Sequence, residues 1–506
     1  MKRPALLGAY SGVAQVVVNT GLLLVLVPVF IGTLGLKTYG VYALITGIGS
    51  LGVFTNFGFS TSLIKHLGEQ KDSQESNYDI AVTFIVLGGS SLVVAVVSIV
   101  FREFVLTHVL NLSVETITSP VRWFYVACVG TNVVQVVSLI PSAVLDAQQK
   151  VYVTNGVQLF VGVLGKVFIL CSLLIRPDLA TVGWILLGSA VLGLCILIWL
   201  FFDTWGTLSF PGLIHRFAGV ARKHLMYGKN IYAAGVMGFF YEPATKILIS
   251  HFVGLNEVGF FEIAFRIKGL VWGLLERLLY PVLPLFAVTT DPQRLRGLME
   301  EIQRALVMMI VPLAVASFFL TQPVVSLWLG GAILPVIIGI ISIVNSYLVA
   351  LLFVPLYHFL NVKGYPQKAL ILQTINVAAN VVLFVLLAPV FGYYGALSAF
   401  CLAVLSSSAM CVHFQRSLLG SRPVGSKEFG GKMIKLAAGM VVANLLSFRL
   451  FEADGLRLGM LLIANLVSSV ALFRQLRLVT VEDVARYIGR NNRIGLTLEK
   501  LLIQPL

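Results

Sequence analysis

Long apolar runs follow one another along almost the whole sequence, and this feature most limits what the chain can fold into. A membrane-spanning helix needs about 20 mostly apolar residues, and fourteen runs reach that length. They lie near residues 5–31, 40–64, 79–101, 120–144, 151–175, 179–202, 229–252, 258–286, 303–328, 332–358, 367–389, 392–415, 433–449 and 455–473. A β-barrel would instead need short strands in which polar and apolar residues alternate. We therefore predict an all-α polytopic integral membrane protein with about 14 transmembrane helices.

Charge supports this prediction and limits the class of function. Only 11% of the 506 residues are charged, whereas about 25% is usual in soluble proteins. The net charge of +14 would suggest nucleic-acid binding in a soluble protein, but here Lys and Arg concentrate in alternate loops. If the N-terminus is inside, the outer loops hold only Lys37, Arg102, Arg122, Arg176, Arg449 and Arg457. Because cytoplasmic loops are rich in Lys and Arg, we expect both termini in the cytoplasm and no nucleic-acid partner.

The sequence offers no motif for a metal, a cofactor or catalysis. Its five cysteines lie in apolar runs without paired spacing, so we expect them to pack as small buried side chains. The longest predicted outer loop, near 102–119, is short and carries no paired carboxylates, nucleophile or metal motif. A membrane enzyme such as a polysaccharide polymerase or ligase would need such groups, and we predict that this protein is not an enzyme.

An internal repeat indicates two related halves. The run LGLKTYGVYAL follows the first span and VGLNEVGFFEI follows the seventh, so that Gly35 and Gly40 match Gly254 and Gly259. A looser match joins VLDAQQKVYVTN, after the fourth span, to FLNVKGYPQKAL, after the tenth. Six is an even number of spans, so both halves enter the membrane in the same direction, as in repeats related by an axis along the membrane normal.

The repeat predicts two six-helix pseudo-symmetric lobes plus two C-terminal helices. The predicted parts are an N-lobe over 1–205, a cytoplasmic linker over 206–228, a C-lobe over 229–416, spans 13 and 14 over 417–475 and a cytoplasmic tail over 476–506. The linker region is a basic loop that we expect to contact anionic lipid headgroups. In the tail, Thr480 and Asp483 predict the start of a short helix over 481–489, which lies on a surface or binds a partner.

Charged residues inside the spans are the strongest functional signal. A charge at the bilayer centre costs about 2.5–3.5 kcal/mol, so such groups are expected to face the bundle interior or water. At about 100° per residue, the eighth span places Glu262, Arg266, Glu276, Arg277 and Tyr280 on one stripe. Its remaining cation, Lys268, falls outside that stripe.

The seventh span adds a second charged group. Glu242 and Lys246 are spaced for an ion pair, and Pro243 between them is expected to kink the helix. These cations could bind a pyrophosphate or acidic sugars. Alternatively, Glu242–Lys246 and Glu262–Arg266 are mutually neutralised pairs that only pack, and Arg277 reaches the cytoplasmic interface.

Polar residues also mark the fifth and first spans. Asn155, Gln158, Gly162 and Lys166 share one helical face, with Lys166 near the middle of the membrane, and the first span carries Gln15 and Asn19. The amides are expected either to form interhelical hydrogen bonds or to meet substrate. The predicted substrate-binding cavity therefore comprises Arg266, Lys268, Lys166, Arg277, Lys246, Glu262, Glu242, Glu276, Tyr280, Asn19 and Gln15.

The run from Leu34 to Glu69, LGLKTYGVYALITGIGSLGVFTNFGFSTSLIKHLGE, resembles the second-span signature of polysaccharide flippases. These are the Wzx-like and PST-type members of the multidrug/oligosaccharidyl-lipid/polysaccharide exporter (MOP) superfamily. FGYYGALSAF, from Phe391 to Phe400, is similar to the family's start of span twelve. The resemblance implies two lobes around a central cavity that opens to alternate faces of a bacterial or archaeal cytoplasmic membrane. It also implies a polyprenyl-pyrophosphate-linked oligosaccharide, such as an O-antigen unit, as substrate, and leaves further polysaccharide assembly proteins as potential partners.

Two relatives of this function stay open. A flippase for the peptidoglycan lipid precursor would share the fold and the chemistry of its substrate. A cation-coupled multidrug antiporter of the same superfamily is disfavoured, because a pump for organic cations is expected to use membrane carboxylates without basic neighbours. Here Glu242, Glu262 and Glu276 each have a basic residue one to four positions away.

Overall fold

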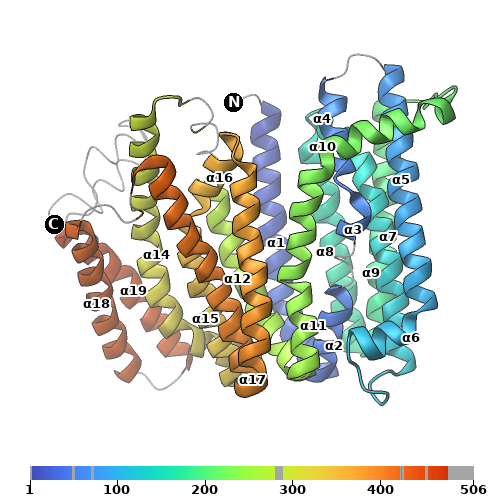
Figure 1. Cartoon of the computed structure of the whole chain (residues 1–506). Coiled ribbons are helices and arrows are strands. Elements are labelled where there is room, and N and C mark those ends of the chain that lie inside the picture. The colour runs from blue at the N-terminus through green and yellow to red at the C-terminus, as the bar shows by residue number, and fades with distance from the viewer. Residues whose placement is uncertain are drawn as a thin grey trace. The chain divides into compact units, whose positions relative to one another are not determined.

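The computed structural model describes residues 3–47, 52–69, 73–279, 286, 289–421, 423, 427–450 and 454–476. Over these residues the chain is almost entirely helical and contains no strand. Eleven of the helices there are long and apolar enough to cross a membrane. The prediction of an all-α polytopic membrane protein is confirmed (Figure 1).

Long helices built from the predicted apolar runs make up the first part of the chain. They are α1 (Arg3–Leu34), α5 (Ser73–Val100), α7 (Ser119–Ala147), α8 (Val151–Ile175) and α9 (Leu179–Trp205). The start of α9 shows the local cause: the Asp178 carboxylate accepts a hydrogen bond from the Thr181 N–H at 2.9 Å, satisfying a donor that the helix itself cannot pair. A short α6 (Arg102–Phe104) and a π-helical turn, η2 (Val105–Val109), follow α5.

The second part of the chain is also helical. It contains α14 (Pro292–Leu329), α15 (Leu334–Leu351), α16 (Val354–Val362), α17 (Pro366–Leu419), α18 (Lys427–Leu450) and α19 (Asp454–Gln475). Within α17 the backbone of Gly392 has φ 56° and ψ −132°, a conformation that favours glycine because it has no Cβ. The chain reverses there, as Figure 1 shows, so α17 supplies two spans, as the sequence predicted.

Two predicted segments differ from the structure. The run 40–64 is not one helix but consists of α2 (Leu36–Gly47), α3 (Gly52–Asn56) and α4 (Phe59–Glu69). The interruption before α4 lies at Phe57 and Gly58, both with positive φ. The linker was predicted as a basic loop, yet α10 (Leu213–Tyr241) begins within it. One face of α10 packs through its apolar residues against α3, α4 and α5.

The predicted kink at Pro243 is confirmed. Helix α10 ends at Tyr241 and α11 (Pro243–Phe252) begins directly after Glu242, followed by α12 (Leu255–Leu279). Proline lacks the N–H that would continue the helical hydrogen bonds and its ring clashes with the preceding turn.

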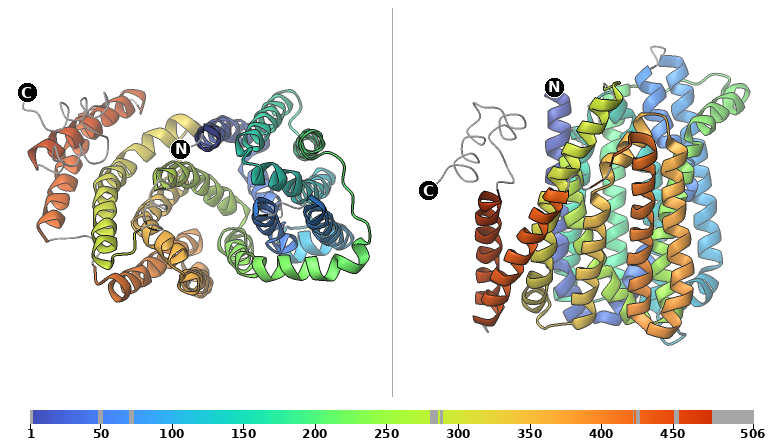
Figure 2. Two further views of the ribbon diagram at one scale, coloured as in Figure 1. Left: turned by 90° about the horizontal axis from the view of Figure 1, so that it is seen from above. Right: turned by 60° about the vertical axis from the view of Figure 1, so that its left-hand side comes forward.

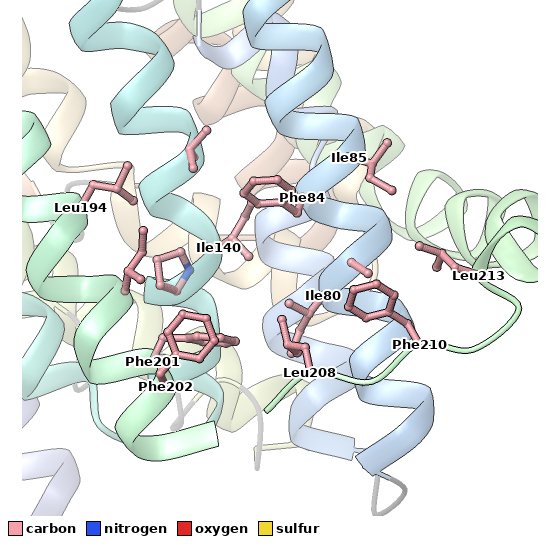
Figure 3. A pocket seen from close by; sticks show the side chains of 14 residues that line it. Ile80, Phe84, Ile85, Ile140, Leu194, Phe201, Phe202, Leu208, Phe210 and Leu213 are labelled. Atoms are coloured by element: carbon pink, nitrogen blue, oxygen red, sulfur yellow. The ribbon is translucent and has the colours of Figure 1, made fainter. Parts of the chain in front are cut away.

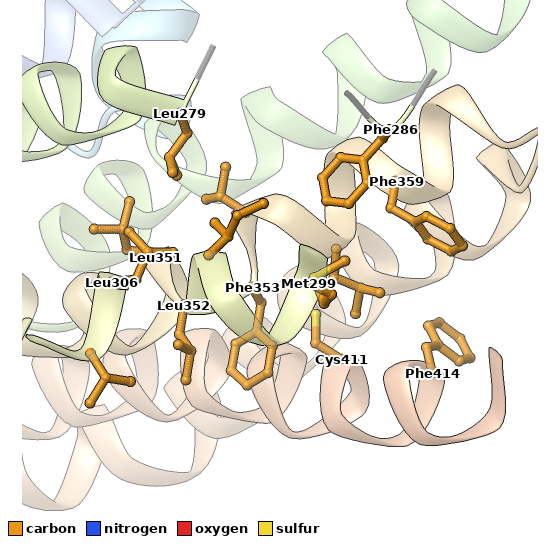
Figure 4. Close-up of a cluster of buried hydrophobic side chains, with 14 of the residues drawn as sticks. Leu279, Phe286, Met299, Leu306, Leu351, Leu352, Phe353, Phe359, Cys411 and Phe414 are labelled. Atoms are coloured by element: carbon orange, nitrogen blue, oxygen red, sulfur yellow. The ribbon is translucent and has the colours of Figure 1, made fainter. Parts of the chain in front are cut away.

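The chain divides into two compact units. The first comprises Met1–Ile263 and Asn376–Phe400, and the second comprises Ala264–Ile375 and Cys401–Leu506. Figure 2 shows the helices from α5 to α9 of the first unit seen end on. Each unit has an apolar core: one surrounds Phe59 and Val144, and the other surrounds Met299 and Phe359 (Figure 4). The predicted lobe boundaries at 205 and 229 remain a prediction.

Within the first unit, the two copies of the repeated motif pack against each other. A Cβ added to Gly40 of α2 would lie 2.0 Å from the carbonyl oxygen of Leu255, and one added to Gly259 of α12 would lie 3.2 Å from that of Leu36. Two glycines that correspond in the repeat thus each meet backbone of the other copy. This reciprocity is what a two-fold relation between the copies predicts.

Candidate functional site

A polar cavity lies inside the first unit, between α1, α2, α7, α8 and α9. Its volume is about 440 Å³. Hydroxyls, amides and one amine line it alongside apolar side chains, and the residues that carry them are Tyr42, Thr131, Gln135, Ser138, Ser142, Gln158, Lys166 and Ser189. The cavity therefore offers hydrogen-bond donors and acceptors at the depth of membrane-spanning helices, where such groups are costly unless they serve packing or binding.

Lys166 of α8 joins the cavity wall to α1. Its Nζ donates to Asn19 Oδ1 at 2.5 Å and to the Gly162 carbonyl at 3.2 Å. A Cβ on Gly162 would lie 2.5 Å from Asn19 Oδ1, so only glycine lets the amide approach closely enough. The ammonium is thus held in a fixed position rather than being free to reach an interface.

Other amide side chains form further hydrogen bonds between α1 and α8. Gln15 Nε2 donates to Gln158 Oε1 at 2.8 Å, and Asn155 Nδ2 donates to Ser11 Oγ at 3.0 Å. Predicted residues from two separate spans are therefore brought together as interhelical hydrogen bonds. Lys166 and Gln158 also line the cavity, and a role in substrate binding stays a prediction for them.

A second group of predicted residues forms a charged triad. Lys246 Nζ lies 2.7 Å from Glu242 Oε1 and 2.6 Å from Glu262 Oε2. The predicted pair within the seventh span is thus present, and Glu262 has an ion-pair partner on α11 that spacing along its own helix did not indicate. Lys246 and Glu262 are buried, and the Glu242 side chain is 34% exposed. Nearby, Asn380 Nδ2 donates to Thr245 Oγ1 at 2.7 Å.

The predicted charges of the second unit are arranged differently. Lys268 is buried with its ammonium 3.6 Å from the centre of the Phe265 ring and 4.2 Å from that of Tyr347 on α15. This cation–π contact explains why the residue lies off the stripe of its own helix. Arg266 and Glu276 are half-buried on α12.

Two members of the predicted stripe cannot be placed. The side chain of Arg277 and the whole of Tyr280 lie outside the described residues, as does the tail helix predicted over 481–489. The single cationic cavity that would contain all predicted site residues therefore stays a prediction.

Sequence reasoning missed one buried ionic cluster near the start of α5. Asp79, fully buried, lies 2.6 Å from Lys223 Nζ and 3.3 Å from His224 Nε2. His224 is also fully buried, and its Nδ1 lies 2.8 Å from Ser62 Oγ. The signal was an acid at the first position of an apolar run, but its partners are about 145 residues away on α10, at a contact that sequence spacing does not reveal.

The sequence profile of a family described as "Polysaccharide biosynthesis protein" matches residues 34–338, more than half of the chain. The chain belongs to this family. No curated protein sequence matches it. The matched range contains α2 to α12, and with them the triad and most of the cavity wall.

Solved structures show the fold that this family member shares. A structure described as "Lipid II flippase MurJ, inward closed conformation" is 13% identical with a TM-score of 0.73 and covers 93% of this chain and 100% of its own. The inward-facing conformation of a multidrug resistance MATE family transporter of the MOP superfamily is 13% identical with a TM-score of 0.61. The match covers 81% of this chain and 98% of the transporter chain. The Vibrio cholerae MATE transporter VcmN in its bent form is 12% identical with a TM-score of 0.53. The match covers 82% of this chain and 96% of the VcmN chain.

The chain is thus a member of the polysaccharide biosynthesis family with several helices able to cross a membrane, and its fold is similar to that of the solved MurJ flippase and MATE transporter structures. The resemblance noted in the second span is confirmed at this level.

Proposed function

We propose that this protein translocates a polyprenyl-pyrophosphate-linked oligosaccharide, such as an O-antigen or other surface polysaccharide unit, from the cytoplasmic to the outer leaflet. The observation that carries the proposal is the polar cavity with Lys166 in its wall, inside a member of a polysaccharide biosynthesis family. Amide and hydroxyl groups can bond the hydroxyls of a sugar, and an ammonium can bind a phosphate or a sugar carboxylate.

The proposed mechanism is alternating access without covalent chemistry. The head group enters a polar cavity, cationic side chains offset its negative charge, and the polyprenyl tail stays in the bilayer. A flippase needs only to lower the barrier for a polar head group in the membrane core, which a hydrated polar cavity does by replacing water contacts with protein contacts. The additional predicted contacts in the C-lobe, Arg266 among them, belong to this proposal.

The decisive experiment deletes the gene and measures lipid-linked oligosaccharide on each membrane face. Accumulation on the cytoplasmic face, reversed by the wild-type gene, is expected. If peptidoglycan lipid precursor accumulates instead, the substrate is the other lipid considered above. If neither accumulates and sensitivity to cationic drugs rises, the protein is an antiporter and the proposal is wrong.

The cavity is tested separately in the complemented strain. Lys166→Ala should reduce export at least tenfold at equal protein level, because one buried charge contact with an anion is worth about 1.5–3 kcal/mol. Lys166→Arg should retain part of the activity, since the positive charge remains. The control is Lys435→Ala, which removes the same charge from an exposed position on α18. Unchanged export in Lys166→Ala would remove the cavity from the mechanism.

A further inference from the structure

An apolar groove runs along the outside of the first unit. α5, α7, α9 and the segment leading into α10 enclose it, with a volume of about 410 Å³. All of its lining residues are apolar, and they include Ile198 of α9. Figure 3 labels others of them, among them Ile80, Phe84, Ile140, Phe202 and Phe210. The groove is open at the surface, because Phe84 is 56% and Phe202 53% exposed. On a membrane-spanning bundle, an open apolar surface of this kind faces lipid chains.

One end of the groove is closed by a fixed piece of the chain. The Tyr78 hydroxyl donates to the Pro211 carbonyl at 2.6 Å, and Trp205 Nε1 donates to Asn77 Oδ1 at 2.8 Å. These two bonds attach the segment between α9 and α10 to the start of α5. Phe210, within that segment, consequently forms part of the groove wall.

Two cations flank this closed end. Arg216 lies one turn of α10 beyond the groove residue Leu213, with its guanidinium 5.0 Å from the centre of the Tyr78 ring. Lys150 Nζ donates to Thr204 Oγ1 at 3.2 Å, two residues beyond the groove residue Phe202. From 203 to 229 the sequence contains four Lys and Arg residues and a single acid. The groove thus combines a carbon-lined channel with a cationic end.

We propose that this groove binds an acyl chain of an anionic membrane phospholipid, whose phosphate lies between Arg216 and Lys150. The charge at the closed end selects a negative headgroup, and the channel accepts a flexible hydrocarbon chain. By the distribution of loop charges, this end faces the cytoplasm, where anionic headgroups attract basic segments. Bound lipid would fasten the start of α10 to the membrane surface.

The lipid bound here is not the transported one. On α7, the cavity is lined by Gln135, Ser138 and Ser142, whereas the groove is lined by Ile140 and Pro141 on the opposite helical face. Cavity and groove share no lining residue. A substrate whose head group occupies the cavity therefore cannot place its tail directly in this groove, and the proposal does not depend on the proposed function.

The test uses the full-length protein in nanodiscs of phosphatidylglycerol and phosphatidylethanolamine in equal amounts, followed by native mass spectrometry of the retained lipid. Wild type should retain phosphatidylglycerol about thirtyfold in preference, since two basic residues near a headgroup contribute about 1 kcal/mol each. Arg216→Gln should reduce that preference about fivefold. Ile198→Trp should reduce retention of both lipids by filling the channel.

Matched controls separate this site from general lipid contact. Arg176→Gln removes an exposed charge between α8 and α9. Leu174→Trp adds an indole ring, as Ile198→Trp does, but at a 66% exposed position on α8 that lines neither the cavity nor the groove. Both should behave as wild type. Arg216 is exposed, so its variant is expected to fold even if Ile198→Trp does not.

Three results would overturn the proposal. The first is unchanged phosphatidylglycerol preference in Arg216→Gln. The second is equal retention of the two lipids by wild type. The third is that added polyprenyl phosphate displaces phosphatidylglycerol from the wild-type protein, which would assign the groove to the transported lipid. Export measurements do not enter the test, so failure here leaves the proposed function untouched.

Discussion

Buried charges in this protein are held by partners on other helices. Glu262 of α12 meets Lys246 of α11, and Asp79 of α5 meets Lys223 of α10. Leaving such a charge without its partner would destabilise the folded protein by several kcal/mol. Each pair therefore favours one arrangement of the two helices that carry it. Spacing along one helix identified only the Glu242–Lys246 pair.

Asp79→Asn is expected to destabilise the protein by about 3 kcal/mol, because it leaves buried His224 and the Lys223 amine without their carboxylate. The measurement is the thermal unfolding midpoint of the detergent-purified protein, which should fall clearly. As a control, Glu428→Gln removes an acid that is 78% exposed and paired with Lys432, a contact worth about 0–1 kcal/mol. A midpoint for Asp79→Asn no lower than that of the control would show that the cluster contributes little to stability.

His66 of α4 should make the protein sensitive to acid. Burial, together with the neighbouring charge of Lys223, lowers the pKa of His66 below its ordinary value. A histidine with a lowered folded-state pKa stabilises the fold above its unfolded pKa of about 6.5, and that contribution is lost as pH falls through the folded pKa. The unfolding midpoint should therefore fall as the pH drops below about 6.5. The unfolding midpoint of the His66→Gln variant should fall less as the pH drops. The His215→Gln variant, changed at an exposed position of α10, should show the same fall as wild type.

At the scale of helices, close packing depends on glycines at helix crossings. Gly40 and Gly259 bring α2 and α12 into backbone contact within the first unit, and Gly162 of α8 leaves room for the Asn19 side chain of α1. Small residues allow such approaches in membrane proteins because van der Waals contact, rather than the hydrophobic effect, holds the helices together.

Gly40→Ala should separate the two repeat copies, since its Cβ would lie 2.0 Å from the Leu255 carbonyl oxygen and backbone cannot move aside cheaply. We expect a lower unfolding midpoint and at least tenfold lower export at equal protein level. Gly47→Ala, at the end of the same helix, meets nothing within 4 Å. There the midpoint should stay unchanged or rise slightly, because alanine favours a helix by about 0.5–1 kcal/mol over glycine. Equal effects of the two changes would contradict the packing argument.

For the whole molecule, the distribution of basic residues predicts the direction of insertion. Lys and Arg concentrate in the termini and in every second loop, whereas the intervening loops hold only Lys37, Arg102, Arg122, Arg176, Arg449 and Arg457. Both termini should therefore be cytoplasmic. Alkaline phosphatase, which is active only outside, should be inactive when fused after residue 476 and active when inserted near Val114, an 83% exposed residue between α5 and α7. The reverse activities would invert every assignment of faces made above.

Much of the fold could be predicted because the membrane imposes it. A segment of about 20 apolar residues must form a helix in lipid, since its backbone groups have no other partner. The separation of the spans 367–389 and 392–415 and the kink at Pro243 could also be predicted, because they depend on residues close together in the chain; that Gly392 makes the turn came from the structure. The break at Phe57 and Gly58 could not be predicted, because the contact that accompanies it is with distant Gly228.

What the sequence alone determined was the class of the protein, its helices, its repeat and which polar residues must avoid lipid. Those properties depend on neighbours along the chain and on the cost of placing charge in hydrocarbon. Only the tertiary structure decided which side chains meet: that Lys166 bonds Asn19, that Lys246 joins two glutamates, and that Lys268 stacks on Tyr347. Helical spacing gives the face of a residue, but the partner depends on how whole helices pack, and that is set by contacts between residues far apart in the chain.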